Sequence, residues 1–311
     1  MHTSRKRILL AVDGSNASLE AVRYVGGIFP FSRTEVVLFH VAANIPGIFW
    51  HISEDFRDRT APARAWVHET HRIMSSFMDE ATHELMMAGF APKNVTAKIN
   101  RQHDGVVRDI VAEAMQGYDA VVVSRKDRSR AKEALIGKTG SRLMKKLHDM
   151  PIIVVSGRPC IRKIMIALDS TEDASRGVAC VARLLAETPT DITLCHAIKS
   201  PTVYYPPASL YYGEGQTETW AARRRERIDP WLAKAHGHLT GAGIAPDCIR
   251  IAILEDCVSR ATGMLEEARK TGIGTVVTGR RHLSTLESWL FGSVSRQIVN
   301  WARGMAVWVA A

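Results

Sequence analysis

The sequence predicts an α/β protein made of two tandem, doubly wound domains, each built on a five-stranded parallel sheet. Two observations predict this class. Short aliphatic runs, typical of strands buried on both faces, alternate along the chain with segments of helical periodicity. The same order of segments then occurs a second time at a nearly constant offset. We therefore expect each half to fold as one sheet with helices on both faces.

The repeat is clearest where each half begins. RKRILLAVDGSNASLEAVRYV at 5–25 matches IRKIMIALDSTEDASRGVACV at 161–181, at an offset of 156. LFHVA at 38–42 matches LCHAI at 194–198 at the same offset. Aligned aliphatic, acidic and histidine positions over such lengths indicate a duplication.

The repeat continues to the end of each half, with the offset between the two copies reduced by one residue. VVVS at 121–124 matches VVTG at 276–279 at an offset of 155. Between the copies, Gly and Pro interrupt the pattern in the segment SGRPCI at 156–161. We therefore expect two domains, 1–157 and 158–311.

The elements of each half follow in order from these patterns. In the first half, strands are expected at 7–12, 35–41, 94–101, 119–124 and 151–155, and helices at 16–28, 62–89, 105–116 and 139–148. In the second half, strands are expected at 163–168, 191–197, 248–254, 274–278 and 305–310. Connections between parallel strands should be right-handed crossovers.

The composition excludes several classes of protein. No apolar run approaches the roughly 20 residues that a membrane-spanning helix needs. The first apolar run, ILLAV, ends at Asp13 and is too short for the core of a signal peptide. The five cysteines include no CxxC motif, which favours free thiols in a reducing compartment over disulfides or a zinc site. We therefore expect a cytoplasmic protein.

The net charge of +9 is spread over both halves. Residues 1–157 hold 22 Lys and Arg against 17 Asp and Glu, and the remainder holds 19 against 15. Such an excess raises the local concentration of anions, including nucleotides, and supports solubility equally well. No basic and aromatic interleaving extends beyond ARRRER at 222–227, so nucleic acid is not an expected partner.

Polar residues follow the first and fourth predicted strands of each half. In open parallel sheets, ligands bind beyond the carboxyl ends of the strands, at the point where the strand order reverses. The first half places Asp13 to Ser15 and Ser124 to Asp127 there. The second half places Asp169 to Thr171 and Gly279 to His282 at the same positions. These segments are the expected ligand edge.

With these residues in place, the chain resembles a tandem universal stress protein over nearly its whole length, once per half. The family opens with a strand ending in V-D-x-S, here AVDGS and ALDST, and has a His-Val pair that ends the second strand, here HV and HA. Its nucleotide-binding members carry Gly, two residues, Gly, nine residues and Gly-Ser/Thr after the fourth strand. The resemblance implies a Rossmann-like, adenine-nucleotide-hydrolase-like fold and a pseudo-dimer through the fifth strands. It also implies a stress-response regulatory or binding protein.

The resemblance implies ATP or another adenine nucleotide as the ligand. The family's nucleotide-binding members use the first-strand Asp, backbone groups after the second-strand His, and the loop that follows the fourth strand. By position, the implied ligands in the second half are Asp169, Ala197, Gly279, Arg280, His282, Gly292, Ser293 and Ser295. In the first half they are Asp13, Val41, Ser124, Asp127, Gly137 and Lys138. Whether Mg²⁺ binds beside the phosphates stays an open question at this point, and no other residues predict a metal site.

The two loops after the fourth strands differ in how well they suit a phosphate. Phosphate oxygens need backbone N–H groups at close approach, which favours Gly and a helix N-terminus. The second half keeps Gly279 and Gly292, with His282 in place of the middle glycine. The first half keeps only Gly137, and Asp127 in the middle position would repel a phosphate. Nucleotide binding is therefore expected in the second half, and a solvated basic loop is favoured in the first.

Three alternative functions stay open at the level of the sequence. One is a nucleic-acid accessory protein, which would require salt-sensitive binding to RNA or DNA. With both loops degenerate, the chain would be a protein–protein interaction module without a nucleotide. With a bound nucleotide, it could also be a weak ATPase. His40 and His196 end their strands without an evident Ser or Cys nucleophile, so a structural role is favoured and no enzyme is predicted.

Overall fold

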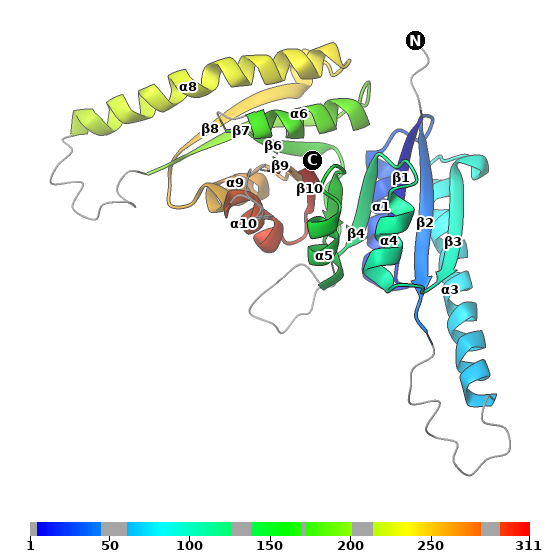
Figure 1. Ribbon diagram of the computed structural model, residues 1–311. Helices are drawn as coiled ribbons and strands as arrows, with labels where there is room; N and C mark the ends of the chain where they lie inside the picture. The colour runs from blue at the N-terminus through cyan, green and yellow to red at the C-terminus, as the bar shows by residue number, and fades with distance from the viewer. Residues whose placement is uncertain (1–4, 45–60, 126–137, 170–171, 201–213, 281–292) are drawn as a thin grey trace.

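One mostly parallel sheet of ten strands joins the two halves of the chain in the computed structural model, which describes residues 5–44, 61–125, 138–169, 172–200, 214–280 and 293–311 (Figure 1). Within these residues the strand order is β3-β2-β1-β4-β5-β10-β9-β6-β7-β8. The strands are β1 Lys6–Ala11, β2 Thr34–Ala42, β3 Val95–Arg101, β4 Ala120–Ser124, β5 Ile152–Val155, β6 Lys163–Ala167, β7 Asp191–Lys199, β8 Ile249–Cys257, β9 Thr275–Gly279 and β10 Ala306–Ala310.

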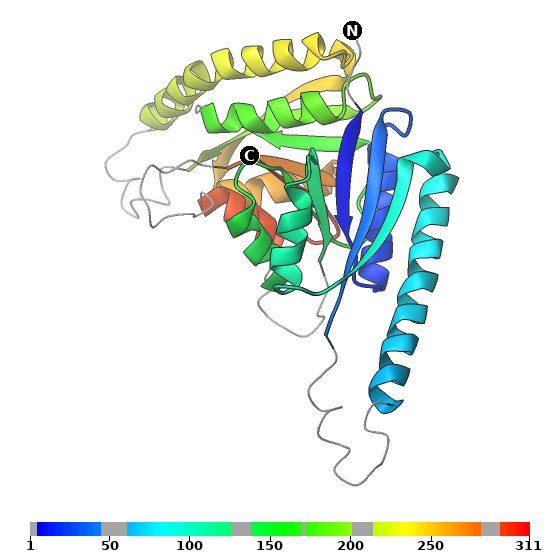
Figure 2. The ribbon, with the colours of Figure 1, turned by 45° about the vertical axis from the view of Figure 1, so that its right-hand side comes forward.

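The two faces of this sheet are covered by helices. The helices are α1 Asn16–Ile28, α3 Ala61–Met87, α4 Val106–Ala114, α5 Lys138–Lys146, α6 Glu172–Leu184, α8 Glu214–Gly241, α9 Arg260–Lys270 and α10 Ser293–Trp301. Side chains of α1, α3, α6 and α8 share one buried cluster, and those of α4, α5, α9 and α10 share the other. Figure 2 shows α6 beside α8 on the same face of the second half. The predicted doubly wound α/β class is thus confirmed.

The two halves meet through their fifth strands. β5 and β10 pair antiparallel, with Ile153 opposite Trp308, whereas the other strand pairs of the described residues are parallel. Each half therefore keeps the same internal order, which reverses between β1 and β4 in the first half and between β6 and β9 in the second. This arrangement fits an intramolecular pseudo-dimer.

The expected element bounds agree closely with the structure, and the larger differences have local causes. α1 covers the expected residues because Ser15 caps its N-terminus, accepting a hydrogen bond from Ser18 N. The long helix of the first half ends at Met87, two residues early, close to Gly89 with its φ of +104°. β8 extends to Cys257, beyond the expected end at 254, because an irregular register lets Lys199 pair with Cys257.

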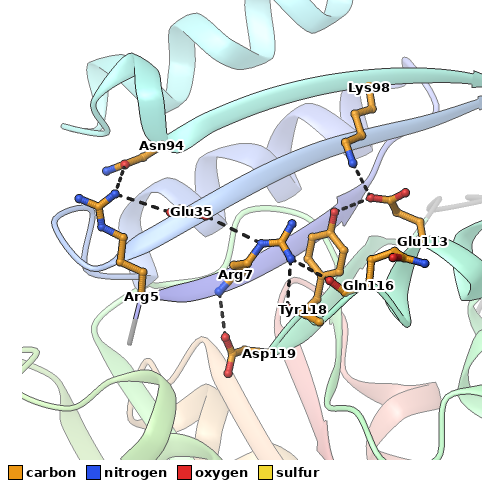
Figure 3. A network of polar contacts seen from close by, with 10 residues as sticks. Arg5, Arg7, Glu35, Asn94, Lys98, Glu113, Gln116, Tyr118 and Asp119 are labelled. Atoms are coloured by element: carbon orange, nitrogen blue, oxygen red, sulfur yellow. Dashed lines mark hydrogen bonds and ion pairs between the residues drawn. The ribbon is translucent and has the colours of Figure 1, made fainter. Parts of the chain in front are cut away.

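A polar network ties β1 to its neighbours in the first half (Figure 3). The guanidinium of Arg7 lies 4.5 Å from the ring centroid of Tyr118. Glu113 accepts hydrogen bonds from Lys98 Nζ at 2.8 Å and from Tyr118 Oη at 2.5 Å. Partial burial opposes the charge of Glu113, but these two donors outweigh burial and hold its pKa below the usual range. Asp119 Oδ2 accepts from Arg7 N at 2.9 Å, which fixes Asp119 just before β4.

Of the helices that the structure describes, none combines the length and the apolar composition that crossing a bilayer requires.

Candidate functional site

The ligand edge of the first half is closed by a hydrogen-bonded cluster of short polar side chains. After β1 the chain turns at Gly14, whose φ is +77°, and enters α1. Asp13 Oδ1 accepts from Ser15 N at 3.1 Å, Ser15 Oγ at 2.5 Å and Ser18 Oγ at 2.8 Å. Ser18 Oγ in turn accepts from Asp13 N at 3.1 Å. The carboxylate is therefore occupied by groups from the first turn of α1.

Ser18 also connects this cluster to the end of β4. Its side chain is fully buried, and Ser18 Oγ lies 3.2 Å from Ser124 Oγ. Because the single Ser18 proton goes to Asp13, Ser124 is the donor in this contact. Asp13 and Ser124, two predicted ligand positions of the first half, are thus brought together by a residue that the sequence argument missed. Its signal was weak, since one Ser on the buried face of a helix has many ordinary explanations.

The equivalent edge of the second half has a different construction. Gly279 ends β9 at the position of Ser124 and brings no side chain. Ser295 Oγ donates to Gly279 O at 3.1 Å and lies 2.7 Å from Thr278 Oγ1. Ser295 is buried, so its hydroxyl anchors the first turn of α10 to the end of β9. The structure therefore joins the predicted ligands Gly279 and Ser295 by a direct bond and places the exposed Ser293 at the start of α10.

The two strand-end histidines hold the second strand of each half to the first. His40 Nδ1 lies 2.9 Å from Val12 O, and His196 Nδ1 lies 2.8 Å from Leu168 O. A carbonyl only accepts, so Nδ1 carries the proton in both rings. Burial lowers the pKa of His196, Arg260 and Arg224 lower it further, and the Leu168 bond and Asp169 act in the opposite direction. A neutral, structural His196 agrees with the interpretation from the sequence.

The residues that follow these histidines would contact a ligand through their backbone groups. Val41 and Ala197 are both buried, with 6% and 1% of their surface exposed, and both belong to strand ladders. Asp169 follows Leu168 at the end of β6 and is partly exposed. Asp169 and Ala197 lie at the carboxyl ends of the neighbouring strands β6 and β7, and Val41 lies near the carboxyl end of β2 in the first half.

Arg280, predicted as a phosphate ligand, has partners in the other half of the chain. Arg280 Nη1 donates to Leu147 O at 2.7 Å and to His148 O at 3.4 Å, just beyond the C-terminus of α5. It is only 8% exposed, and burial lowers its pKa while Asp149 acts to raise it. A buried cation at a helix C-terminus satisfies carbonyls that the helix leaves without partners. The geometry gives Arg280 an interface role.

The first half supplies the reciprocal contact. Arg125 follows β4, is 3% exposed, and donates to Ala302 O at 2.9 Å and to Val299 O at the end of α10. Arg125 and Arg280 correspond at an offset of 155, and so do Leu147 and Ala302. The sequence argument placed Arg280 among the implied ligands of the second half, although the matched offset of the two arginines was available.

Several predicted ligand residues lie outside the described residues. They are Asp127, Gly137, His282 and Gly292. Lys138 begins α5, and its side chain is likewise outside the description. Within the described ranges, no group of three or more His, Cys, Asp or Glu side chains is arranged to hold a metal ion.

Comparisons with known proteins bear on both halves. The model of the universal stress protein family matches residues 4–156 and 161–309. The search of curated proteins returned no match. A universal stress protein from Archaeoglobus fulgidus is 14% identical, with a TM-score of 0.62 over 98% of this chain and 97% of its own. A functionally unknown protein from Pseudomonas aeruginosa is 15% identical, with a TM-score of 0.57 over 99% of this chain and 93% of its own.

At these identities the structural likeness shows the fold, and the match to the family model shows that the chain is a member of the family. The chain therefore belongs to the universal stress protein family, and each half is one match to it.

Proposed function

We propose that this chain is a regulatory or binding protein of the stress response whose second domain binds ATP or another adenine nucleotide. The proposed domains are 1–157 and 158–311. A cytoplasmic location is part of the proposal, supported by five cysteines that are all free thiols. One observation carries the assignment to the second domain: Gly279 stands where the first domain has Ser124.

In the first domain, the side chains at the ligand edge satisfy one another. Ser124, Ser18 and Asp13 form a continuous hydrogen-bonded cluster at the end of β1 and β4. A phosphate arriving there would have to displace the hydroxyl groups that now bind the Asp13 carboxylate. The first domain is therefore proposed to leave the nucleotide unbound.

In the second domain, the residue at the position of Ser124 is Gly279, which presents only backbone groups to a ligand. Gly279 has no side chain to obstruct an approaching phosphate, and the next helix of the described residues, α10, begins at Ser293. The first turn of a helix presents N–H groups without helical partners together with partial positive charge. The bond from Ser295 to Gly279 O holds this first turn against β9. These features support a phosphate position between β9 and α10.

The proposed action is binding rather than catalysis. His196 commits its Nδ1 proton to Leu168 O, so it serves the strand ends instead of a reacting group. We propose that Asp169 contacts either the ribose or a Mg²⁺ ion. ATP titrations with and without Mg²⁺ distinguish these two roles.

A weak ATPase is the alternative for the same site, and phosphate release by purified protein would reveal it. A nucleotide-free interaction module is the alternative if no nucleotide binds.

The test is calorimetric titration of the full chain with ATP, ADP and GTP, beside two matched variants. Gly279→Ser copies the first domain into the second and is expected to weaken ATP binding at least about tenfold, or about 1.4 kcal/mol. Ser124→Gly makes the opposite change in the first domain and should leave the affinity unchanged. Absence of ATP binding at millimolar concentration would refute the proposal, and an equal effect of the two variants would refute the assignment to the second domain.

A further inference from the structure

The surface between the two halves is asymmetric although the elements that form it are repeated. α1 corresponds to α6 at an offset of 156, and β4 and β5 correspond to β9 and β10 at an offset of 155. Ile153 and Trp308 are therefore equivalent residues, and they are also register partners across the antiparallel pair. An approximate twofold axis thus passes between an Ile and a Trp.

We propose that this surface pairs a first half only with a second half, so that neither domain pairs with a copy of itself. The inference is independent of nucleotide binding.

The first asymmetric feature is a buried chain of hydrogen bonds on one side of the axis. Trp308 Nε1 donates to Tyr24 Oη at 2.8 Å, and Tyr24 Oη lies 2.9 Å from Thr275 Oγ1. The ring of Phe29 stacks on Trp308, with centroids 5.7 Å apart. Tyr24 and Phe29 come from the first half, whereas Thr275 and Trp308 come from the second. Burial raises the pKa of Tyr24, so its hydroxyl stays protonated and remains a donor.

This chain has no counterpart on the other side of the axis. The residues equivalent to Tyr24, Thr275 and Trp308 are Cys180, Ala120 and Ile153. Ala120 and Ile153 have no polar side-chain atom, so the three hydrogen-bonding groups exist once per chain.

The second asymmetric feature is an ion pair between the halves. Arg183 near the end of α6 pairs with the carboxylate of Asp119, and Arg183 Nη2 also donates to Asp119 O at 3.0 Å. The same carboxylate accepts from Arg7 N, as Figure 3 shows. The residues equivalent to Arg183 and Asp119 are Gly27 and Gly274, which cannot form an ion pair.

The segment that connects the two halves occupies the place of the missing ion pair. A Cβ atom at Gly274 would lie 2.2 Å from both Cys160 N and Cys160 O, and one at Gly27 would lie 2.4 Å from Ile161 Cδ1. Glycine at 274 is therefore required by the close approach of the connecting backbone, whereas a side chain at 27 would have to displace the Ile161 side chain. On the side of the interface without the ion pair, Gly27 and Gly274 therefore lie against the segment that connects the two halves.

A pair of two first halves would satisfy neither feature. By the equivalences above, Tyr24 would face Ile153 and Ala120, which leaves its buried hydroxyl without a partner. Asp119 would face Gly27, so its carboxylate would lose the guanidinium that it now binds.

A pair of two second halves would fail for different reasons. Two Trp308 side chains would meet at the axis in the space that one Trp and one Ile fill, which overpacks the core. Arg183 would face Gly274 and lose its carboxylate. The reciprocal contacts of Arg125 and Arg280 would survive in every combination, so they add affinity without choosing the partner. Unsatisfied groups and clashes in the like pairs are what make the interface selective.

The experiment uses the full-length folded protein with a protease recognition sequence inserted between Arg158 and Pro159. After cleavage, native mass spectrometry should find one first half bound to one second half. Cleaved protein mixed with an isotopically heavy sample, and incubated in mild denaturant to permit exchange, should give mixed-label pairs of unlike halves only. Like pairs at a comparable population, or halves that separate at micromolar concentration after cleavage, would overturn the inference.

Two variants test the features that carry the selectivity. Arg183→Gly, at a partly exposed position that should tolerate the change, removes the unpaired cation from a pair of second halves. It is expected to raise the fraction of that like pair about fivefold. Thr275→Ala with Tyr24→Cys removes the buried polar chain and should raise the fraction of first-half pairs. Arg72→Met, in an exposed ion pair with Glu69 on α3, is the control and should change neither fraction. Unchanged fractions in Arg183→Gly would contradict the role given to that residue, whether or not the double variant folds.

Discussion

Arg280 Nη1 donates a 2.7 Å hydrogen bond to Leu147 O, although the two residues belong to different halves of the chain. Arg125 makes the equivalent bond to Ala302 O at 2.9 Å. Each arginine directly follows the fourth strand of its own half and satisfies carbonyls at the end of the last helix of the other half. The helix that follows each candidate phosphate loop is therefore held in place by the opposite domain.

Replacing Arg280 by Met should destabilise the protein strongly. The variant keeps the apolar stem but leaves Leu147 O and His148 O without the cation that they bind. Hydrogen bonds to charged groups contribute about 1.5–3 kcal/mol, and we expect a loss of that size in urea unfolding followed by circular dichroism. Arg72→Met, in the exposed pair with Glu69, should change the free energy of unfolding by less than about 0.5 kcal/mol.

The same variant distinguishes an interface role from a ligand role. Under the interface role, ATP affinity of folded Arg280→Met should stay within about twofold of the parent protein. A loss of about tenfold or more in affinity, together with unchanged stability, would show that Arg280 contacts the nucleotide instead.

The strands and the helix starts were predictable from the sequence for local reasons. Aliphatic runs buried on both faces mark β1, β4 and β9 directly, and Ser15 marks the N-terminus of α1. The partner of Arg280 was not predictable from local pattern, because the bond spans 133 positions and exists only after two domains dock. The burial of the Ser295 hydroxyl was equally hidden, since it depends on how α10 packs against β9.

Glycines offer a matched pair of substitutions with opposite expected signs. Gly274→Ala would place a Cβ 2.2 Å from backbone atoms of Cys160, so the connection between the halves must shift. We expect a loss of about 1–3 kcal/mol in the free energy of unfolding. Gly237→Ala lies inside α8 with nothing within 4 Å of the new Cβ, and it should stabilise by up to about 1 kcal/mol. Thermal unfolding of both variants is the measurement, and destabilisation by Gly237→Ala as large as that by Gly274→Ala would contradict the packing account.

His196 should make the protein less stable as the pH falls. Burial lowers the pKa of its folded state, whereas the unfolded chain titrates near about 6.5. Between these two values the unfolded state binds the extra proton, so stability declines as the pH falls below about 6.5. Urea unfolding at pH 7.5, 6.5 and 5.5 measures the decline. His196→Gln keeps a donor for Leu168 O without a titrating ring and should show a shallower decline, whereas an equal slope would exclude His196 as the source.

The most direct test of the account is the number of ATP molecules that one full-length chain binds, measured by native mass spectrometry with increasing ATP. The account predicts one ATP per chain, lost in Gly279→Ser and retained in Ser124→Gly, because only the second domain leaves its ligand edge open to a phosphate. Two ATP molecules per chain, or one that persists in Gly279→Ser and is lost in Ser124→Gly, would contradict it.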